Sequence, residues 1–256
     1  MMTALPEAFL RLPIAHRALH DAGAGRPENS RAAVGAAVDA GYGIEIDVQP
    51  SADGVAMVFH DDTLDRLTAE TGPIRARTAA DLGGIALLGG DEGIPTLAEV
   101  LALVAGRVPL LVEIKDQDGA FGPKVGALEA AVASDLAGYD GPVAVMSFNP
   151  HSMAAMAEAA PKVPRGLTTM SWEIEEARAI PEQRRAQLAA IADFDRVGAS
   201  FISHHWRDLT APPVSELKAR GVPLLCWTIR SAEQETQARE LADNITFEGY
   251  RAPRPA

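Results

Sequence analysis

Alternation of apolar and polar residues is clearest over residues 43–48, which read GIEIDV. Side chains along a β-strand point alternately to opposite faces, so Glu45 and Asp47 share one face and the aliphatic residues share the other. A second apolar run, residues 55–59, leads directly to His60. The pattern predicts two strands, the first carrying a pair of carboxylates and the second ending at a histidine.

The connection between these two runs is short and contains Ala52-Asp53-Gly54, a sequence typical of a tight turn. Parallel pairing would need a crossover of about a dozen residues or more, which this connection cannot supply. The two runs are therefore expected to form a β-hairpin that brings His60 near Glu45 and Asp47. Such an arrangement can place an acid/base group beside a metal ion.

Short apolar runs alternate with helical patterns along the whole chain. Asn29 or Ser30 can cap a helix that continues to Gly41, and Thr96 can cap another over Leu97–Ala105. With the return arm of the hairpin left out, eight strands are expected, near residues 12–16, 43–48, 109–115, 143–148, 165–170, 200–204, 223–229 and 244–247. This alternation over about 250 residues predicts the α/β class and a (β/α)8 TIM barrel, with its active site at the carboxyl ends of the strands.

Residues 62–95 interrupt this alternation. They show little periodicity and are rich in Gly, Thr and Asp, and such a stretch is long for a loop inside a compact domain. We expect a small inserted cap that follows the hairpin after strand 2, within a single TIM-barrel domain spanning residues 1–256.

Composition narrows the possible classes of function. Apolar residues make up 47% of the 256-residue chain, and the formal net charge of −12 argues against nucleic-acid binding and a polybasic membrane patch. The single Cys226 excludes an intrachain disulfide and a thiolate metal cluster. No apolar run approaches the roughly 20 residues of a membrane span, and no secretory signal is evident. We expect a cytoplasmic protein without stable membrane insertion. The pattern of apolar residues does not identify an oligomer interface.

Polar residues at the ends of the first three barrel strands are expected to meet at the barrel mouth. They are His16, Arg17, Glu45, Asp47, Glu113 and Lys115, joined by His60 from the hairpin. Carboxylates from two adjacent strands suit a cation that prefers oxygen ligands, Mg²⁺ or Ca²⁺. The two basic residues supply positive charge for an anion, and two histidines can share proton delivery and removal. Together these groups predict phosphodiester cleavage.

In order and spacing, the segments of this chain resemble the glycerophosphodiester phosphodiesterase family of the cytoplasmic bacterial type. The resemblance covers most of the chain. The matching segments are His16-Arg17, Pro27-Glu28-Asn29-Ser30, Glu45-Ile46-Asp47-Val48, Ala52-Asp53-Gly54, Val58-Phe59-His60-Asp61, Leu64-Asp65-Arg66-Leu67-Thr68, Glu113-Ile114-Lys115, Ser147-Phe148 and Trp227-Thr228. The resemblance implies metal-dependent hydrolysis of a small-molecule glycerophosphodiester to sn-glycerol 3-phosphate and an alcohol.

The resemblance also implies a role for particular residues. His16 and His60 would be the catalytic pair, and Glu45, Asp47 and Glu113 would bind the divalent metal. The phosphate would be held by Arg17 and Lys115, and the glycerol side would be lined by Phe148 and Trp227. Glu28 and Asn29, near the mouth in the expected fold, are candidates for hydrogen bonding to the metal ligands.

Several alternatives stay open at this point. A phosphodiesterase of the same barrel family could act on a different diester, such as a lysolipid or a cyclising substrate, and a non-catalytic barrel could bind phosphodiesters. The nucleophile is either water or the substrate's own 2-hydroxyl, and the sequence does not say which histidine is the acid.

The chain departs from the family pattern at three places. Ala18 follows His-Arg where the family usually has Gly, a change expected only to narrow the loop. The loop over residues 19–26 is longer than a minimal version in the family. It contains His20 and Asp21, which are expected either to contact substrate or to cap the turn. Near the C-terminus the usual Thr-Asp pair is replaced by Thr246-Phe247-Glu248, and no functional role is carried to that position.

Three further groups carry weaker expectations. Asp61, Asp62 and Asp65 near the hairpin are expected to orient His60 or to face solvent rather than to extend the metal site. Ser203-His204-His205-Trp206 follows the sixth expected barrel strand, where a substrate contact by His204 or Trp206 is possible but a second metal site is disfavoured, because neighbouring strand residues point to opposite faces. Trp172 and the charged segment after it are expected to form a solvated helical excursion over the barrel top.

Overall fold

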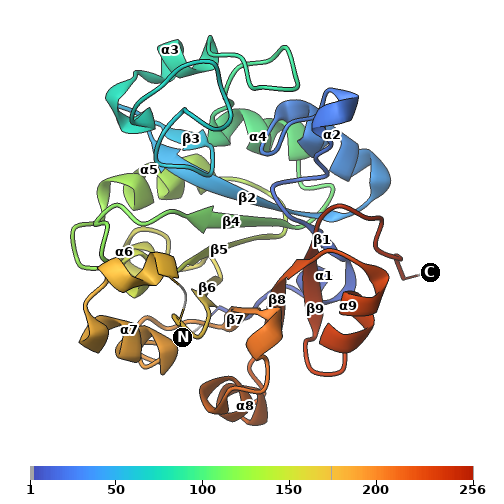
Figure 1. Ribbon diagram of the computed structural model, residues 1–256, viewed down its shortest axis with the longest axis vertical. Helices are drawn as coiled ribbons and strands as arrows, with labels where there is room; N and C mark the ends of the chain where they lie inside the picture. Colours follow the sequence, from blue (N-terminus) through green and yellow to red (C-terminus); the bar gives the residue numbers. More distant parts are fainter. Residues whose placement is uncertain (1–2, 174, 256) are drawn as a thin grey trace.

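Eight parallel strands close into a barrel in the computed structural model, which describes residues 3–173 and 175–255 (Figure 1). The barrel strands are β1 (Ile14–Ala15), β2 (Gly43–Pro50), β4 (Leu110–Ile114), β5 (Val143–Ser147), β6 (Arg165–Thr169), β7 (Phe201–His205), β8 (Leu224–Ile229) and β9 (Asn244–Phe247). Each pairs in parallel with its neighbours in this order, and β1 pairs with both β2 and β9 to close the ring. The predicted (β/α)8 TIM barrel is confirmed.

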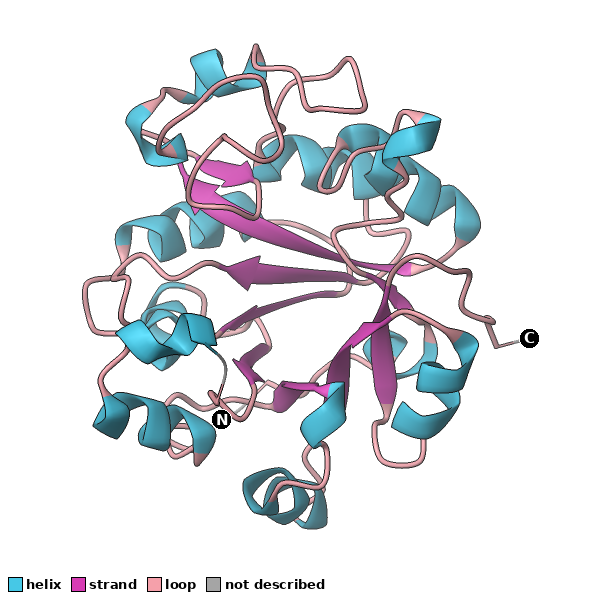
Figure 2. Cartoon of the chain, viewed as in Figure 1, coloured by secondary structure: helices cyan, strands magenta, loops and turns pink. Residues whose placement is uncertain are grey.

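Helices connect successive strands and surround the barrel (Figure 2). They are α2 (Arg31–Ala40), α4 (Leu97–Val104), α5 (Ala127–Leu136), α6 (Pro150–Ala159), α7 (Glu182–Ala189), α8 (Pro212–Ala219) and α9 (Ala232–Ala238), with short 3-10 helices η1 (Ala22–Ala24), η3 (Glu175–Ala179) and η4 (Trp206–Asp208). The predicted caps are present. The Ser30 hydroxyl accepts from the Ala33 N–H, and the Thr96 hydroxyl accepts from the Glu99 N–H.

The predicted hairpin follows β2. Strand β3 (Ala56–Val58) pairs antiparallel with β2, with Val48 opposite Val58. Between them the Gly54 N–H donates to the Ser51 carbonyl at 3.1 Å, and Gly54 has a left-handed backbone with φ of +83°. A glycine adopts this conformation without steric cost, which is why the turn residue is Gly.

Residues 62–95 contain η2 (Ile74–Ala76) and α3 (Ala79–Gly83) and lie beside β3 at one end of the molecule (Figure 1). Their apolar side chains pack with those of the hairpin into a separate cluster, made of Met57, Phe59, Leu64, Leu67, Ile74, Leu82, Leu87 and Ile94. The segment therefore has a small core of its own. That it acts as a cap over the barrel stays a prediction.

Alternation along the strands separates two apolar layers. Ile46 of β2 packs in the large cluster between strands and helices, whereas Leu111 of β4 packs in a smaller cluster with Phe201. Asp47 lies opposite Glu113 in the parallel register of these strands. Because residues two apart share a face, Glu113 lies on the same side of β4 as Leu111, nearer the carboxyl end.

A short helix, α1 (Ala8–Arg11), precedes the barrel. Its Phe9 is fully buried and belongs to the same cluster as Leu111 and Phe201. The buried Asn244 side chain donates to the carbonyls of Phe9 and Leu12, each at 2.7 Å. These bonds tie α1 to the beginning of β9, at the opposite end of the strands from the carboxylates.

Candidate active site

Three carboxylates meet on the inner face of β2 and β4. Glu45 and Asp47 are each 2% exposed and Glu113 is 7% exposed. One oxygen from each lies within 4.8 Å of the other two. The predicted ligand set is thus brought together, and its donors are all hard oxygens, which suits a divalent cation of the Mg²⁺ or Ca²⁺ type.

The electrostatics of this cluster favour a bound cation. Burial and the repulsion of Asp47 and Glu113 raise the pKa of Glu45 well above its ordinary value. Burial would also raise the pKa of Asp47, but Lys115, His60 and Arg17 hold it below its ordinary value. A divalent cation would relieve the repulsion that Glu45 experiences, so the residues present fit a metal ion.

Two basic side chains, Lys115 and Arg17, lie beside the carboxylate cluster. The Lys115 ammonium lies 2.8 Å from Glu113 Oε1 and 3.3 Å from Asp47 Oδ1. Burial would lower the pKa of Lys115, but the two carboxylates raise it above its ordinary value. The Arg17 guanidinium bonds Glu28 at 2.7 Å, while its buried Nε lies 3.6 Å from Asp47 and donates no hydrogen bond within the described chain. The Arg17 guanidinium therefore lies between Glu28 and Asp47 at the edge of the carboxylate cluster.

The loop after β1 positions Arg17 through its backbone. Arg17 and Ala18 are both left-handed, with φ of +51° and +65°. The Arg17 N–H donates to Glu45 Oε2 and the Ala18 N–H to the Glu45 carbonyl, each at 2.9 Å. The expectation that Ala18 only narrows the loop is therefore incomplete. A left-handed alanine costs about 1 kcal/mol relative to an ordinary conformation, a strain that the family's glycine would avoid.

His16 follows β1 and is bonded to Glu248, which follows β9. His16 Nδ1 lies 2.5 Å from Glu248 Oε2, and the His16 N–H donates to the Phe247 carbonyl at 2.9 Å. Burial lowers the pKa of His16, and the bond to Glu248 opposes that effect. Burial would raise the pKa of Glu248, but the hydrogen bond to His16 and the nearby His20 hold it well below its ordinary value.

Glu248 is the site residue that sequence reasoning missed, because its motif departs from the family pattern. A signal was nevertheless available. In a closed eight-stranded barrel the last strand lies beside the first, and here Ala15 is paired with Phe247. The residues that follow these two positions, His16 and Glu248, are then neighbours at the barrel mouth.

His60 has a carboxylate partner of its own. Its Nδ1 lies 2.7 Å from Asp61 Oδ1, which confirms the expectation that Asp61 orients it. Arg66 bonds both Asp61 and Glu28, at 2.7 Å and 2.8 Å, and Glu28 bonds Arg17. A continuous chain of ion pairs thus links the loop carrying His60 to the loop after β1.

Asn29 holds one of the carboxylates directly. Its Nδ2 donates to Asp47 Oδ2 at 3.0 Å, and its Oδ1 accepts from the Asp47 N–H at 3.3 Å. Asn29 is 1% exposed and has a left-handed backbone, with φ of +60°. The structure therefore brings Glu28 and Asn29 to the edge of the carboxylate cluster, and their functional roles stay predictions.

These groups line one cavity of about 170 Å³ at the carboxyl ends of the strands. It contains the nine residues predicted to be catalytic, metal-binding, phosphate-binding or glycerol-lining, which are His16, Arg17, Glu45, Asp47, His60, Glu113, Lys115, Phe148 and Trp227. Arg230 and Thr246 also line it, and the Thr246 hydroxyl is buried without a hydrogen-bond partner in the described chain. We call this cavity the catalytic pocket.

The segment Ser203-His204-His205-Trp206 does not line the catalytic pocket. His204 is buried, with Nδ1 2.7 Å from the Thr169 hydroxyl and Nε2 3.3 Å from Asp208. His205 packs against the Trp227 ring at 5.2 Å. Among the described residues, only the triad of Glu45, Asp47 and Glu113 forms a group that could hold a metal ion, so the His-His pair does not make a second site.

Trp172 differs from its expectation. It is 2% exposed rather than solvated, and its ring packs against Phe121 and Phe148 at centroid distances of 4.9 Å and 5.7 Å. The segment after it does form η3 and α7, apart from residue 174, which lies outside the described residues. Phe121, Phe148 and Trp172 come from three distant parts of the chain. Their mutual packing buries the Trp172 ring.

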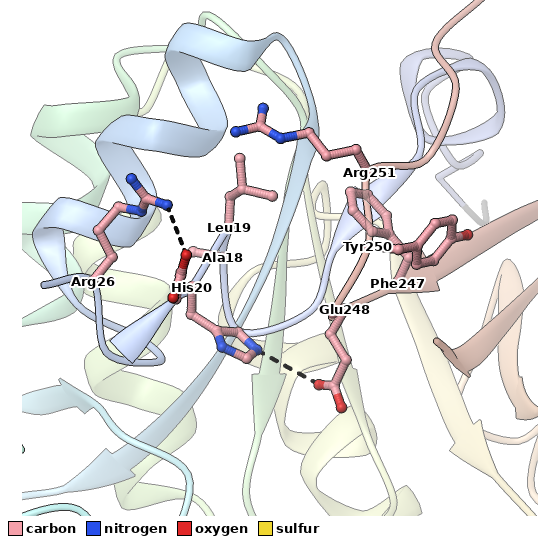
Figure 3. A pocket seen from close by; sticks show the side chains of 10 residues that line it. Ala18, Leu19, His20, Arg26, Phe247, Glu248, Tyr250 and Arg251 are labelled. Atoms are coloured by element: carbon pink, nitrogen blue, oxygen red, sulfur yellow. Dashed lines mark hydrogen bonds and ion pairs between the residues drawn. The ribbon is translucent and has the colours of Figure 1, made fainter. Parts of the chain in front are cut away.

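A larger cavity of about 450 Å³ is lined by Glu248 and by the loop after β1 (Figure 3). Figure 3 shows His20 directed at Glu248, with His20 Nε2 3.6 Å from the carboxylate, and Arg26 and Arg251 on the walls. Arg26 pairs with Asp21 at 3.5 Å. The longer loop after β1 therefore forms one wall of this cavity, and we call it the outer pocket.

None of the helices within residues 3–173 and 175–255 is both long and apolar enough to cross a membrane.

Comparison with known proteins gives a consistent result. The model of the glycerophosphoryl diester phosphodiesterase family matches residues 16–244. A glycerophosphodiester phosphodiesterase from Caldanaerobacter subterraneus subsp. tengcongensis is 28% identical over 231 residues, 86% of this chain and 87% of that protein.

Solved structures share the fold. A phosphodiesterase from Oleispira antarctica, in complex with the product sn-glycerol-3-phosphate, is 26% identical with a TM-score of 0.75, and the match covers 93% of each chain. A glycerophosphodiester phosphodiesterase from Parabacteroides distasonis is 22% identical with a TM-score of 0.72, covering 93% of this chain and 92% of that one. The latter likeness supports the fold alone.

Proposed function

Because the chain belongs to the glycerophosphoryl diester phosphodiesterase family and is an enzyme of that class, we propose that it hydrolyses glycerophosphodiesters to sn-glycerol 3-phosphate and an alcohol. One observation carries this proposal. A single pocket is lined by three buried carboxylates, two cations and two histidines, each histidine paired with its own carboxylate. The Oleispira relative in complex with sn-glycerol-3-phosphate supports the same product.

Glu45, Asp47 and Glu113 hold the divalent ion, for which we propose Mg²⁺ or Ca²⁺. When bound, the ion supplies Lewis-acid stabilisation of charge on the phosphoryl oxygens. Arg17 and Lys115, which both line the catalytic pocket, bind the non-bridging oxygens of the phosphate. These positive charges are fixed before the substrate arrives, so they stabilise the transition state without reorganisation.

The two histidines move the protons. A carboxylate only accepts hydrogen bonds, so the Nδ1 of His16 and of His60 donates to its partner and Nε2 is the nitrogen that exchanges protons with substrate. One Nε2 accepts the proton of the attacking water or 2-hydroxyl, and the other delivers a proton to the departing alkoxide. Phe148 and Trp227 line the side that takes the glycerol, and residues 62–95 act as a cap beside the hairpin.

A lysolipid substrate is less consistent with the surface. Leu88, at 51% exposure, is the one large hydrophobic side chain that is strongly exposed among the residues described. A lipid-binding mouth would need a contiguous apolar patch. A binding-only barrel is disfavoured because every group needed for turnover lines the same pocket.

The test is the formation of sn-glycerol 3-phosphate from glycerophosphocholine and glycerophosphoethanolamine, with Mg²⁺, with Ca²⁺ and with EDTA. We expect metal-dependent product from the wild type and a loss of about 10²–10⁴-fold in His60→Ala, the usual contribution of one positioned acid or base. An absence of turnover of both diesters with either metal would contradict the proposal.

A further inference from the structure

A third chamber adjoins the catalytic pocket on the side of β4. It has a volume of about 320 Å³ and shares Glu113, Lys115 and Phe148 with the catalytic pocket. A phosphate held by Lys115 would therefore lie at its entrance. We call this cavity the aromatic chamber, after the rings that line it.

The apolar wall of the aromatic chamber consists of Phe121, Phe148, Met170 and Trp172. The Phe121 and Trp172 rings meet edge to face at 4.9 Å. The loop carrying Phe121 is held from two sides. Asp116 accepts from the Phe121 N–H at 3.2 Å, and Arg184 Nε donates to the Phe121 carbonyl at 3.0 Å. The rings are thus fixed in position before any ligand enters.

Two carboxylates also line the aromatic chamber. They are Asp62 and Asp116, and neither lies within 4.0 Å of a Lys, Arg or His nitrogen in the described part of the chain. Gln49 donates to Asp62 at 3.0 Å, and Asn149 donates to Asp116 at 2.7 Å. Asp116 also accepts from the N–H groups of Asp118, Gly119 and Phe121.

The nearby cations do not offset these charges. Lys115 is engaged by Asp47 and Glu113, and Arg75 lines a neighbouring cavity without pairing with Asp62 or Asp116. Asp116 is stabilised by the N–H groups of its own loop, whereas the Asp62 carboxylate accepts a hydrogen bond only from Gln49 among the described residues. The aromatic chamber therefore combines aromatic rings with the negative charge of Asp62.

We propose that the aromatic chamber binds the cationic amino-alcohol headgroup of the diester, so that its ammonium lies between the aromatic rings and Asp62. The inference rests on the proposed phosphodiesterase function and names the headgroup class. Ring quadrupoles attract cations, most of all the quaternary ammonium that carries methyl groups into an apolar wall. The outer pocket is poorly suited to this group, because Arg26 and Arg251 line it (Figure 3) and neither Arg17 nor Lys115 does.

The experiment compares kcat/KM for glycerophosphocholine with kcat/KM for glycerophosphoglycerol, whose headgroup is neutral. Asp62→Asn removes one charge, and Phe121→Leu removes a ring while keeping an apolar side chain. Each is expected to lower the choline-to-glycerol ratio by roughly 3- to 30-fold, the range of a partly to fully desolvated cation–π contact. Two controls are expected to keep the wild-type ratio: Asp39→Asn, which removes an exposed carboxylate on α2, and Arg251→Met in the outer pocket.

A second readout does not require catalysis. Choline should quench or shift the tryptophan fluorescence of the wild type, and Asp62→Asn and Phe121→Leu should weaken its binding by a similar factor. If both diesters are cleaved but the ratio is unchanged in both variants, or changes in Arg251→Met instead, the headgroup inference is wrong and the proposed function stands. If no diester is cleaved, the proposed function fails. If choline does not bind to the wild type, the headgroup inference is wrong, whatever the result for turnover.

Discussion

His16 and Glu248 are joined by a 2.5 Å hydrogen bond between Nδ1 and Oε2, although 232 positions separate them in the chain. The bond fixes the ring and leaves Nε2 available to exchange protons. Glu248 does not need to touch substrate to act in this way, so we regard it as a positioning residue for His16.

Replacing Glu248 with Gln removes the charge and keeps the size of the side chain. We expect kcat to fall roughly 10- to 100-fold with little change in KM. Because Glu248 raises the pKa of His16 against the effect of burial, the limb of the pH profile that reports His16 should move to lower pH. The matched control is Glu240→Gln, an exposed glutamate after α9. An unchanged kcat and pH profile in Glu248→Gln would leave this carboxylate without a positioning role.

Metal binding should stabilise the fold as well as support turnover. At about 100 times its Kd, Mg²⁺ or Ca²⁺ adds about 2.7 kcal/mol to the free energy of unfolding, which corresponds to an increase in Tm of about 5–10 °C for a protein of this size. Asp47→Asn, which removes one buried ligand, should reduce the increase to below about 2 °C. Thermal unfolding with metal and with EDTA measures both, and Asp39→Asn serves as the control. Equal shifts in all three proteins would place the stabilising ion elsewhere.

Glu28 should make stability depend on pH in the acid range. Burial would raise its pKa, but hydrogen bonds from Arg66 and Arg17 lower it below the ordinary value of 4.5. The unfolded chain therefore binds a proton at a higher pH than the folded chain, so this contribution is present above about pH 5 and is lost as the pH falls. In Glu28→Gln the free energy of unfolding should decline less steeply between about pH 6 and about pH 3. Urea unfolding across this range is the measurement, and parallel curves for wild type and variant would contradict it.

Gly166 of β6 packs directly against the Phe201 ring, which leaves no room for a side chain at position 166. A Cβ at position 166 would clash with three carbons of that ring, and Phe201 is fully buried. Gly166→Ala should lower the free energy of unfolding by about 1–3 kcal/mol, the usual cost of overpacking. The control is Gly35→Ala in α2, where a Cβ meets nothing within 4 Å. That change should stabilise by about 0.5–1 kcal/mol. Urea unfolding of both variants checks the pair, and a neutral Gly166→Ala would mean that the ring can move aside.

Much of the fold could be predicted because its information is local. The two-residue period at 43–48 places Glu45 and Asp47 on one face whatever the rest of the chain does. A turn at residues 52–54 determines the hairpin and so the approach of His60. The position of Glu113 on the neighbouring strand follows once the barrel is recognised, since parallel strands end at the same edge.

The parts that were missed depend on contacts between distant irregular segments. Phe121 and Trp172 lie in loops with left-handed backbones, φ of +56° and +62°, and no period in the sequence relates one to the other. Trp172 was therefore expected in solvent and is buried. Glu248 was missed for a different reason, because a motif comparison stops where the motif changes, whereas the pairing of β1 with β9 continues past it.

The closure of the barrel through β1 also has a consequence for biosynthesis. Strand β1 is only two residues long and is held on one side by β9. A ribosome that has made the metal ligands of β2 and β4 must still translate more than a hundred further codons before Glu248 can meet His16. A chain that ends before β9 would thus carry its metal ligands but lack both the strand that closes the ring and the carboxylate that positions His16.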